Sequence, residues 1–198
     1  MKDVLIFVEG IADFKFIQDY IRYLFDVKLG KDRIVEIGGC NQELLNKSAL
    51  SFRENTDKGG TNLLIFDADD NFEEKIKGLE IAKKALGLEF EIFLFPNNEL
   101  PGDLEILLCN IINLRHNDIF ECWKNYENCL QSSENSYTLP ARKTKIYAYL
   151  EALVGRSNSQ KEKIKERNRN YRNTEHWNLD IDYLHPLKTF LHPHFITT

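Results

Sequence analysis

Short apolar runs alternate with amphipathic stretches through the first half of the chain. Residues 4–8, 34–37, 63–66 and 91–95 have the apolar character of strands that are buried on both faces of a parallel sheet. Between these runs, apolar side chains recur at helical spacing and predict helices over residues 12–25, 41–52 and 72–86, with Gly87 ending the third. The alternation predicts an α/β fold with a mostly parallel four-stranded sheet flanked by helices.

The pattern changes after the fourth run. Helical spacing predicts helices over residues 104–114, 117–130, 143–153 and 181–191, with a polar loop at 131–137 and a charged stretch at 155–171. We therefore divide the chain into an α/β domain, residues 1–115, and a helical C-terminal extension, residues 116–198, that packs on it.

Composition narrows the class of protein. With 198 residues, 42% hydrophobic and 29% charged, the chain is long enough for one sizeable core and is not of a disordered type. No apolar run approaches the ~20 residues of a membrane helix, and the first apolar run is too short and too acidic for a signal peptide. Four cysteines without CxxC spacing favour neither a zinc ribbon nor a disulfide framework. We expect a cytoplasmic protein with no membrane contact.

Charge is distributed unevenly. The formal net charge of −5 argues against a protein held to nucleic acid by overall basicity. Residues 142–172, however, contain ten Lys or Arg and only three Glu, so the remainder of the chain is strongly acidic. This stretch either tracks a phosphate backbone or is an ordinary solvated face. The side chains expected to contact phosphate are Arg142, Lys163, Lys165, Arg167 and Arg169.

Carboxylates follow three of the four predicted strands. Glu9 ends the first, Asp67 and Asp69 end the third, and Asp103 and Glu105 follow the fourth. In a parallel sheet these strand ends share one edge, where ligands bind. Two residues apart in an extended chain, Asp67 and Asp69 are expected to face the same way. Carboxylates of this kind suit Mg²⁺, Mn²⁺ or Ca²⁺ rather than zinc, although strand-end acids also serve as helix caps.

Other acidic or phosphate-binding motifs do not fit. Counted from Asp67, an EF-hand loop has Phe72 where glycine is required and Gly78 where the bidentate glutamate belongs. No segment resembles the glycine-rich P-loop.

Taken together, the acidic motifs resemble a known domain. The sequence Glu9-Gly10-Ile11-Ala12-Asp13 after one strand and Asp67-Ala68-Asp69 after another resembles the Toprim domain of topoisomerases, primases, recombination proteins and OLD-family nucleases. Asp13 and the motif Gly102-Asp103-Leu104-Glu105 are similar to the OLD-like branch, and also to small stand-alone Toprim proteins of unknown function. The resemblance covers roughly residues 1–110, and it does not include the ATPase domain of full-length OLD proteins.

This resemblance implies a Mg²⁺- or Mn²⁺-dependent nuclease that cleaves DNA or RNA, in the setting of defence against phage or mobile elements. Glu9 would be a metal ligand or general acid–base, and Asp67 and Asp69 would bind metal with it. The second metal position would be formed by Asp13, Asp103 and Glu105. A downstream lysine, either Lys143 or Lys145, would neutralise charge that develops on the phosphate.

Alternatives to a nuclease stay open at this point. The acids can belong to a non-catalytic Toprim-type module that binds nucleic acid or a protein partner. A phosphatase of the haloacid dehalogenase type is disfavoured because Asp70-Asn71 replace the expected Gly-[Thr/Val]. A receiver-like signalling domain would instead trap phosphate on one aspartate. The oligomeric state and the partner are left open.

Overall fold

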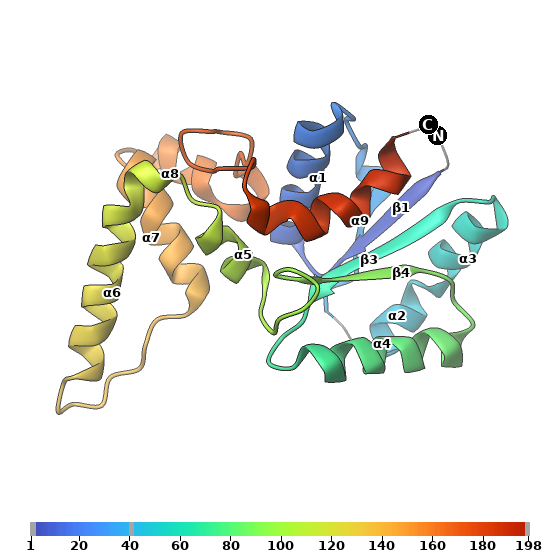
Figure 1. The fold of residues 1–198 in the computed structure, drawn as a ribbon, viewed down its shortest axis with the longest axis horizontal. Helices are drawn as coiled ribbons and strands as arrows, with labels where there is room; N and C mark the ends of the chain where they lie inside the picture. Colours follow the sequence, from blue (N-terminus) through green and yellow to red (C-terminus); the bar gives the residue numbers. More distant parts are fainter. Residues whose placement is uncertain (1–2, 40–41, 197–198) are drawn as a thin grey trace.

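The four predicted strands form one sheet in a computed structural model that describes residues 3–39 and 42–196. The strands are β1 (Val4–Val8), β2 (Ile34–Glu36), β3 (Thr61–Asp67) and β4 (Glu91–Phe95), in the order β2-β1-β3-β4. All three pairings are parallel, which confirms the predicted α/β sheet (Figure 1).

Helices cover both faces of this sheet. On one face lie α1 (Ile11–Phe25) and α9 (His185–Phe195), and on the other lie α2 (Gln42–Lys47), α3 (Ala49–Asp57) and α4 (Phe72–Leu86) (Figure 1). Successive side chains along a strand pack alternately into the cores on the two faces of the sheet. Leu63 and Ile65 belong to the core under α1, whereas Leu64 and Phe66 belong to the core over α3 and α4. This double burial explains why the strands are apolar without alternation.

Residues next to each end of α4 determine where this helix begins and ends. Asn71 caps the helix by accepting a hydrogen bond from the backbone N–H of Glu74 at 3.1 Å, and Gly87 ends it in the left-handed conformation. Both ends therefore agree with the prediction over residues 72–86.

Three predicted helices differ from the structure. The helix expected over residues 41–52 is two helices that meet at Ser48, and the second continues to Asp57; residue 41 itself lies outside the described residues. The helix expected over 104–114 ends early as α5 (Leu104–Asn110), followed by a short 3-10 helix, η2 (Leu114–His116). Apolar spacing continues across both breaks, so it does not reveal them. The helix expected over residues 181–191 is a 3-10 turn, η4 (Asp182–Leu184), followed by α9, which begins at His185 and continues to Phe195.

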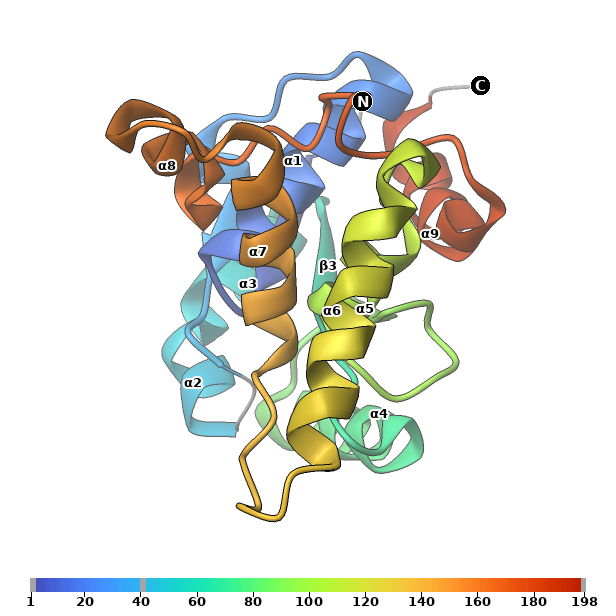
Figure 2. The same cartoon turned by 90° about the vertical axis from the view of Figure 1, so that its left-hand side faces the viewer.

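The C-terminal extension lies at one end of the sheet. It contains α6 (Asn117–Gln131), α7 (Arg142–Val154), α8 (Asn158–Ile164) and a 3-10 turn, η3 (Glu166–Asn168). Seen from that end, α6 and α7 lie in front of the strands (Figure 2). Phe16 of the α/β part shares one core with Tyr171, Trp177 and Leu187 of the extension, so no break in packing occurs at residue 115. Within the described part of the chain, no helix is both long and apolar enough to cross a bilayer.

Candidate functional site

The strand order creates a switch point between β1 and β3. The chain leaves β1 toward β2 on one side and then crosses over to β3 on the other, so β1 and β3 are neighbours whose following segments diverge. Glu9 follows β1 and Asp67 ends β3, and the backbone N–H of Asp67 donates to Glu9 Oε1 at 3.2 Å. The carboxyl ends of the strands at such a switch point are the usual ligand site of an open α/β sheet, and we refer to this edge of the sheet as the crevice.

Asp13 is placed beside these two acids by the first turn of α1. Its side chain is buried, and its Oδ2 accepts a hydrogen bond from the backbone N–H of Gly10 at 2.8 Å. The Glu-Gly-x-x-Asp spacing thus closes the turn that leads from strand to helix. Burial, reinforced by the charges of Glu9 and Glu105, raises the pKa of Asp13 to about 7.

Four carboxyl groups share this crevice. Burial raises the pKa of Asp67 to about 8, with further contributions from Asp13, Glu9 and Glu105, although a hydrogen bond from the Leu104 N–H at 3.0 Å opposes the rise. Burial also raises the pKa values of Glu9 and Glu105. The structure therefore brings together acids from the predicted first, second and third motifs. A bound cation would reduce the repulsion between their charges.

Asp69 departs from its predicted placement. The chain is not extended here, because Asp69 has a φ of 54° and forms a two-way backbone bridge with Gly102, with N–O distances of 2.9 and 2.7 Å. The extended conformation expected for the chain at Asp69 is therefore wrong. The Asp69 carboxylate is 65% exposed at the rim of the crevice, and its charge acts on Glu9.

Gly102 shows why the third motif begins with glycine. Its φ is 141°, and a Cβ atom built on it would lie 2.5 Å from Cδ1 of Ile106. Only glycine combines this backbone conformation with so little space. The residue thereby joins the loop after β3 to the loop that carries Asp103 and Glu105.

Lys75 is the site residue that sequence reasoning missed. It lies in the first turn of α4, and its Nζ is 2.5 Å from Asp69 Oδ2 and 3.4 Å from Glu9 Oε1. Its side chain is only 14% exposed. In the sequence, the signal for Lys75 is its position about one turn into the helix that follows Asp-x-Asp. A lysine at that position is not distinguishable from an ordinary solvated lysine. Lys75 supplies part of the positive charge that the acids require.

Asp103 reaches the same rim but has partners of its own. Its Oδ1 caps α5 by accepting from the backbone N–H of Ile106 at 2.9 Å. Its Oδ2 accepts from Arg142 Nε at 2.8 Å. Arg142, expected to contact phosphate, thus ties the extension to the third acidic motif.

The two candidate lysines lie in different surroundings. Lys143 forms an ion pair with Glu166, and its charge acts on the carboxyl group of Glu105. Lys145 instead stacks over the ring of Phe120, with Nζ 4.6 Å from its centroid. The structure therefore directs Lys143 toward the acids and Lys145 toward α6.

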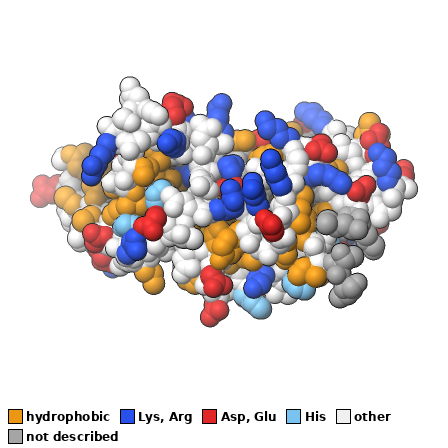
Figure 3. All heavy atoms as spheres, turned by 90° about the horizontal axis from the view of Figure 1, so that it is seen from above, with side chains coloured by type: hydrophobic (Ala, Val, Ile, Leu, Met, Phe, Trp, Pro, Cys, Tyr) orange, Lys and Arg blue, Asp and Glu red, His pale blue; other side chains and the backbone are white. Residues whose placement is uncertain are grey.

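Four of the five side chains expected to contact phosphate are exposed, namely Arg142, Lys163, Lys165 and Arg167. Lys165 pairs with Glu162, and Arg167 is exposed. Arg169 was expected on an exposed phosphate-binding face, and this placement is wrong because the side chain is only 3% exposed, packed beside Tyr147 and Tyr171. Lys163 lines a cavity. On the face in Figure 3, Lys and Arg side chains lie among Asp and Glu.

The donor type of the predicted ligands is the one that hard divalent cations prefer. All six predicted ligands are carboxylates, and four of them have raised pKa values. Within residues 3–39 and 42–196, no three or more His, Cys, Asp or Glu side chains are arranged as a formed metal site. The ammonium group of Lys75 is the cation that contacts Glu9 and Asp69 directly.

Comparison with known proteins gives one match. A family model described as "Protein of unknown function (DUF3226)" matches residues 3–195, which includes the acidic crevice and almost all of the extension. Neither the curated proteins nor the solved structures contain a significant match to the chain.

Proposed function

Because the chain belongs to the DUF3226 family, whose description assigns no activity, we propose a function from its own residues. The proposal is divalent-metal-dependent phosphoryl transfer, specifically endonuclease cleavage of DNA or RNA, by a Toprim-type site of the OLD-like branch. The observation that supports it best is the convergence of Glu9, Asp13, Asp67 and Glu105 at the switch point of the sheet, where burial raises the pKa of each carboxyl group above its ordinary value.

The acids would bind two metal ions. Glu9, Asp67 and Asp69 would hold one Mg²⁺ or Mn²⁺ ion, and Asp13 and Glu105 would hold a second, with Asp103 at its edge. Bound there, the metal supplies Lewis-acid stabilisation of charge on phosphate oxygens. The hydrogen bond from the Asp67 N–H keeps the Glu9 carboxylate oriented toward the crevice.

Two lysines would act on the substrate side of the crevice. Lys143, beside Glu105, is the candidate for neutralising phosphate charge in the transition state. Lys75 would exchange its contact with Asp69 for one with a phosphate oxygen when a metal binds.

Under this proposal the protein acts on its substrate in the cytoplasm. The described cysteines, Cys109, Cys122 and Cys129, are free thiols, which supports a reducing compartment, while Cys40 lies outside the described residues. DNA or RNA would approach the rim where the exposed Asp69 and Arg142 side chains lie.

A cleavage assay tests the proposal. Supercoiled plasmid and labelled single-stranded RNA are incubated with the protein and Mg²⁺ or Mn²⁺, and we expect products that disappear with EDTA. Glu9→Gln and Asp67→Asn should abolish cleavage, whereas Glu121→Gln, which changes an exposed acid on α6, should not. Cleavage that survives both crevice substitutions would refute the assignment.

A second candidate function rests on Lys75. Its ion pairs with Asp69 and Glu9 can serve as permanent, metal-independent neutralisation in a non-catalytic module that binds nucleic acid or a protein partner. Thermal unfolding separates the two functions, because only a metal site predicts stabilisation by Mn²⁺ that is lost in Asp67→Asn.

A further inference from the structure

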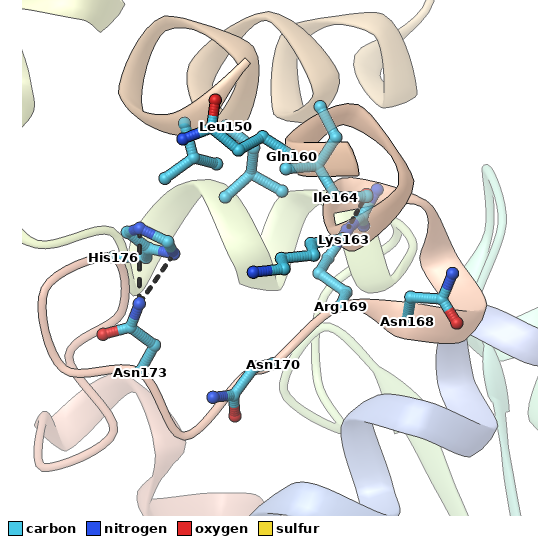
Figure 4. A pocket seen from close by; sticks show the side chains of 10 residues that line it. Leu150, Gln160, Lys163, Ile164, Asn168, Arg169, Asn170, Asn173 and His176 are labelled. Carbon is cyan, nitrogen blue, oxygen red and sulfur yellow. Dashed lines mark hydrogen bonds between the residues drawn. The ribbon is translucent and has the colours of Figure 1, made fainter. Parts of the chain in front are cut away.

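A cavity of about 330 Å³ lies in the C-terminal extension, apart from the acidic crevice. It is bounded by α7, α8 and the chain between residues 168 and 176 and is open to solvent beside Lys163, Asn168 and Asn170 (Figure 4). Leu150, Val154 and Ile164 form its apolar wall. Its volume falls within the range of about 300–1,000 Å³ that is typical of small-molecule sites.

The charged groups of this cavity are all cationic. Lys163 and Arg169 line it, and no Asp or Glu is among its lining residues, although the protein as a whole is acidic. The Lys163 side chain extends into the open centre in Figure 4, and the guanidinium of Arg169 lies at the wall beside Ile164. A cavity with this lining attracts anions.

Arg169 carries an unsatisfied group. Its Nε donates to the Ile164 carbonyl at 3.1 Å and its Nη1 donates to the Tyr171 hydroxyl at 3.2 Å. Its Nη2 is buried and has no hydrogen-bond partner among the described residues. A buried guanidinium without a carboxylate is costly, and because Arg169 lines the cavity, an anion bound there would lie near this positive charge and offset part of the cost.

Amide side chains complete the polar part of the lining. Asn173 lies within 3.2 Å of a ring nitrogen of His176, and Asn170 and Gln160 line other parts of the cavity (Figure 4). Amides and a neutral imidazole offer donors and acceptors of the kind that read the edge of a heterocycle. Burial and the neighbouring His116 lower the pKa of His176, which keeps its ring neutral.

We propose that this cavity binds an organic phosphate of nucleotide size. Lys163 and Arg169 would hold the phosphate, the aliphatic wall would cover the apolar body, and the amides would contact its polar edge. None of the six rim acids lines the cavity, so this inference does not depend on the proposed nuclease activity.

Calorimetric titration of the full chain in EDTA tests the proposal, with adenosine 5′-monophosphate as the probe. We expect saturable binding, weaker binding of inorganic phosphate, which lacks the body, and weaker binding of adenosine, which lacks the charge. Lys163→Ala should weaken binding of the nucleotide about tenfold or more, because a charge-assisted hydrogen bond is lost. Lys165→Ala is the matched control, since this lysine pairs with Glu162 and does not line the cavity.

Several results would overturn the inference. The first is the absence of nucleotide binding at about 10 mM, a concentration that detects even weak sites. The second is an equal loss of nucleotide affinity in Lys163→Ala and Lys165→Ala. The third is tighter binding of succinate than of the nucleotide. Loss of binding in Glu9→Gln would place the nucleotide at the crevice and would also contradict it. Circular dichroism of each variant confirms folding. Absence of nuclease activity with intact nucleotide binding would reject the proposed function and leave this inference standing.

Discussion

Replacing Asp67 by asparagine should stabilise the metal-free protein and flatten its pH dependence. The amide keeps an oxygen that can accept the hydrogen bond from the Leu104 N–H, but it carries no charge. The buried carboxyl group of Asp67, beside Asp13, Glu9 and Glu105, is costly to ionise, and the substitution removes that cost.

The magnitude follows from proton linkage. The pKa values near 7 for Asp13 and near 8 for Asp67 lie above the ordinary value of 3.8, so the folded chain holds protons that the unfolded chain has released. The stability from these groups is complete below pH ~4 and is lost as the pH rises through their folded pKa values. Each such proton changes the free energy of unfolding by about 1.4 kcal/mol per pH unit, so both together give a slope of up to about 2.7.

Urea unfolding at pH 5, 6, 7 and 8 in EDTA measures this slope. Wild type should lose stability with rising pH, and Asp67→Asn should lose it about half as steeply. Glu121→Gln, which changes an exposed carboxylate, should follow wild type. Equal slopes in wild type and Asp67→Asn, or stability of wild type that rises across this interval, would refute the assigned proton binding. Added Mg²⁺ should stabilise wild type most at pH 8, where the ligands ionise readily.

Three other substitutions probe the crevice. Lys75→Met removes the ammonium group that contacts Glu9 and Asp69, so Mn²⁺ should bind more tightly in calorimetry, and unchanged affinity would contradict competition between lysine and metal. Gly102→Ala should lower the melting temperature by several degrees in a calorimetric scan, because φ is positive and the new Cβ would displace the end of the Ile106 side chain; a wild-type melting temperature would disprove the strain. Lys143→Ala should lower kcat of cleavage at least tenfold, whereas Lys145→Ala should lower it little, and the reverse order would reassign the lysine.

Much of the fold was predictable from local pattern. The bounds of β1, β4 and α4 agree with the apolar runs, because strands buried on both faces and a helix with Asn71 and Gly87 at its ends leave strong local signals. The break at Ser48 leaves none, since the apolar spacing is the same on both sides of it.

Prediction of the site failed where distant segments decide the geometry. The positions of the acids after the strands predicted that Glu9, Asp67 and Glu105 would lie at one edge of the sheet, and in the structure the charges of Glu9 and Glu105 act on Asp67. The turn at Asp69 depends on a bridge to Gly102, far along the chain, and could not be predicted from the Asp-x-Asp spacing. Packing beside Tyr147 and Tyr171 likewise buries Arg169, in a stretch whose composition suggests full solvent exposure.

The pairing of Asp19 with the backbone N–H of Tyr171, at 2.9 Å, has a consequence during synthesis. The crevice acids have all been translated once Glu105 has been added. At about 5–20 residues per second, Tyr171 leaves the ribosomal active site roughly 3 to 13 seconds later. Until then α1 lacks the segment that covers Phe16, one of its buried aromatic side chains, in the finished protein. The nascent chain therefore passes through an interval in which all of its crevice acids have been synthesised but the core beside Phe16 cannot yet close.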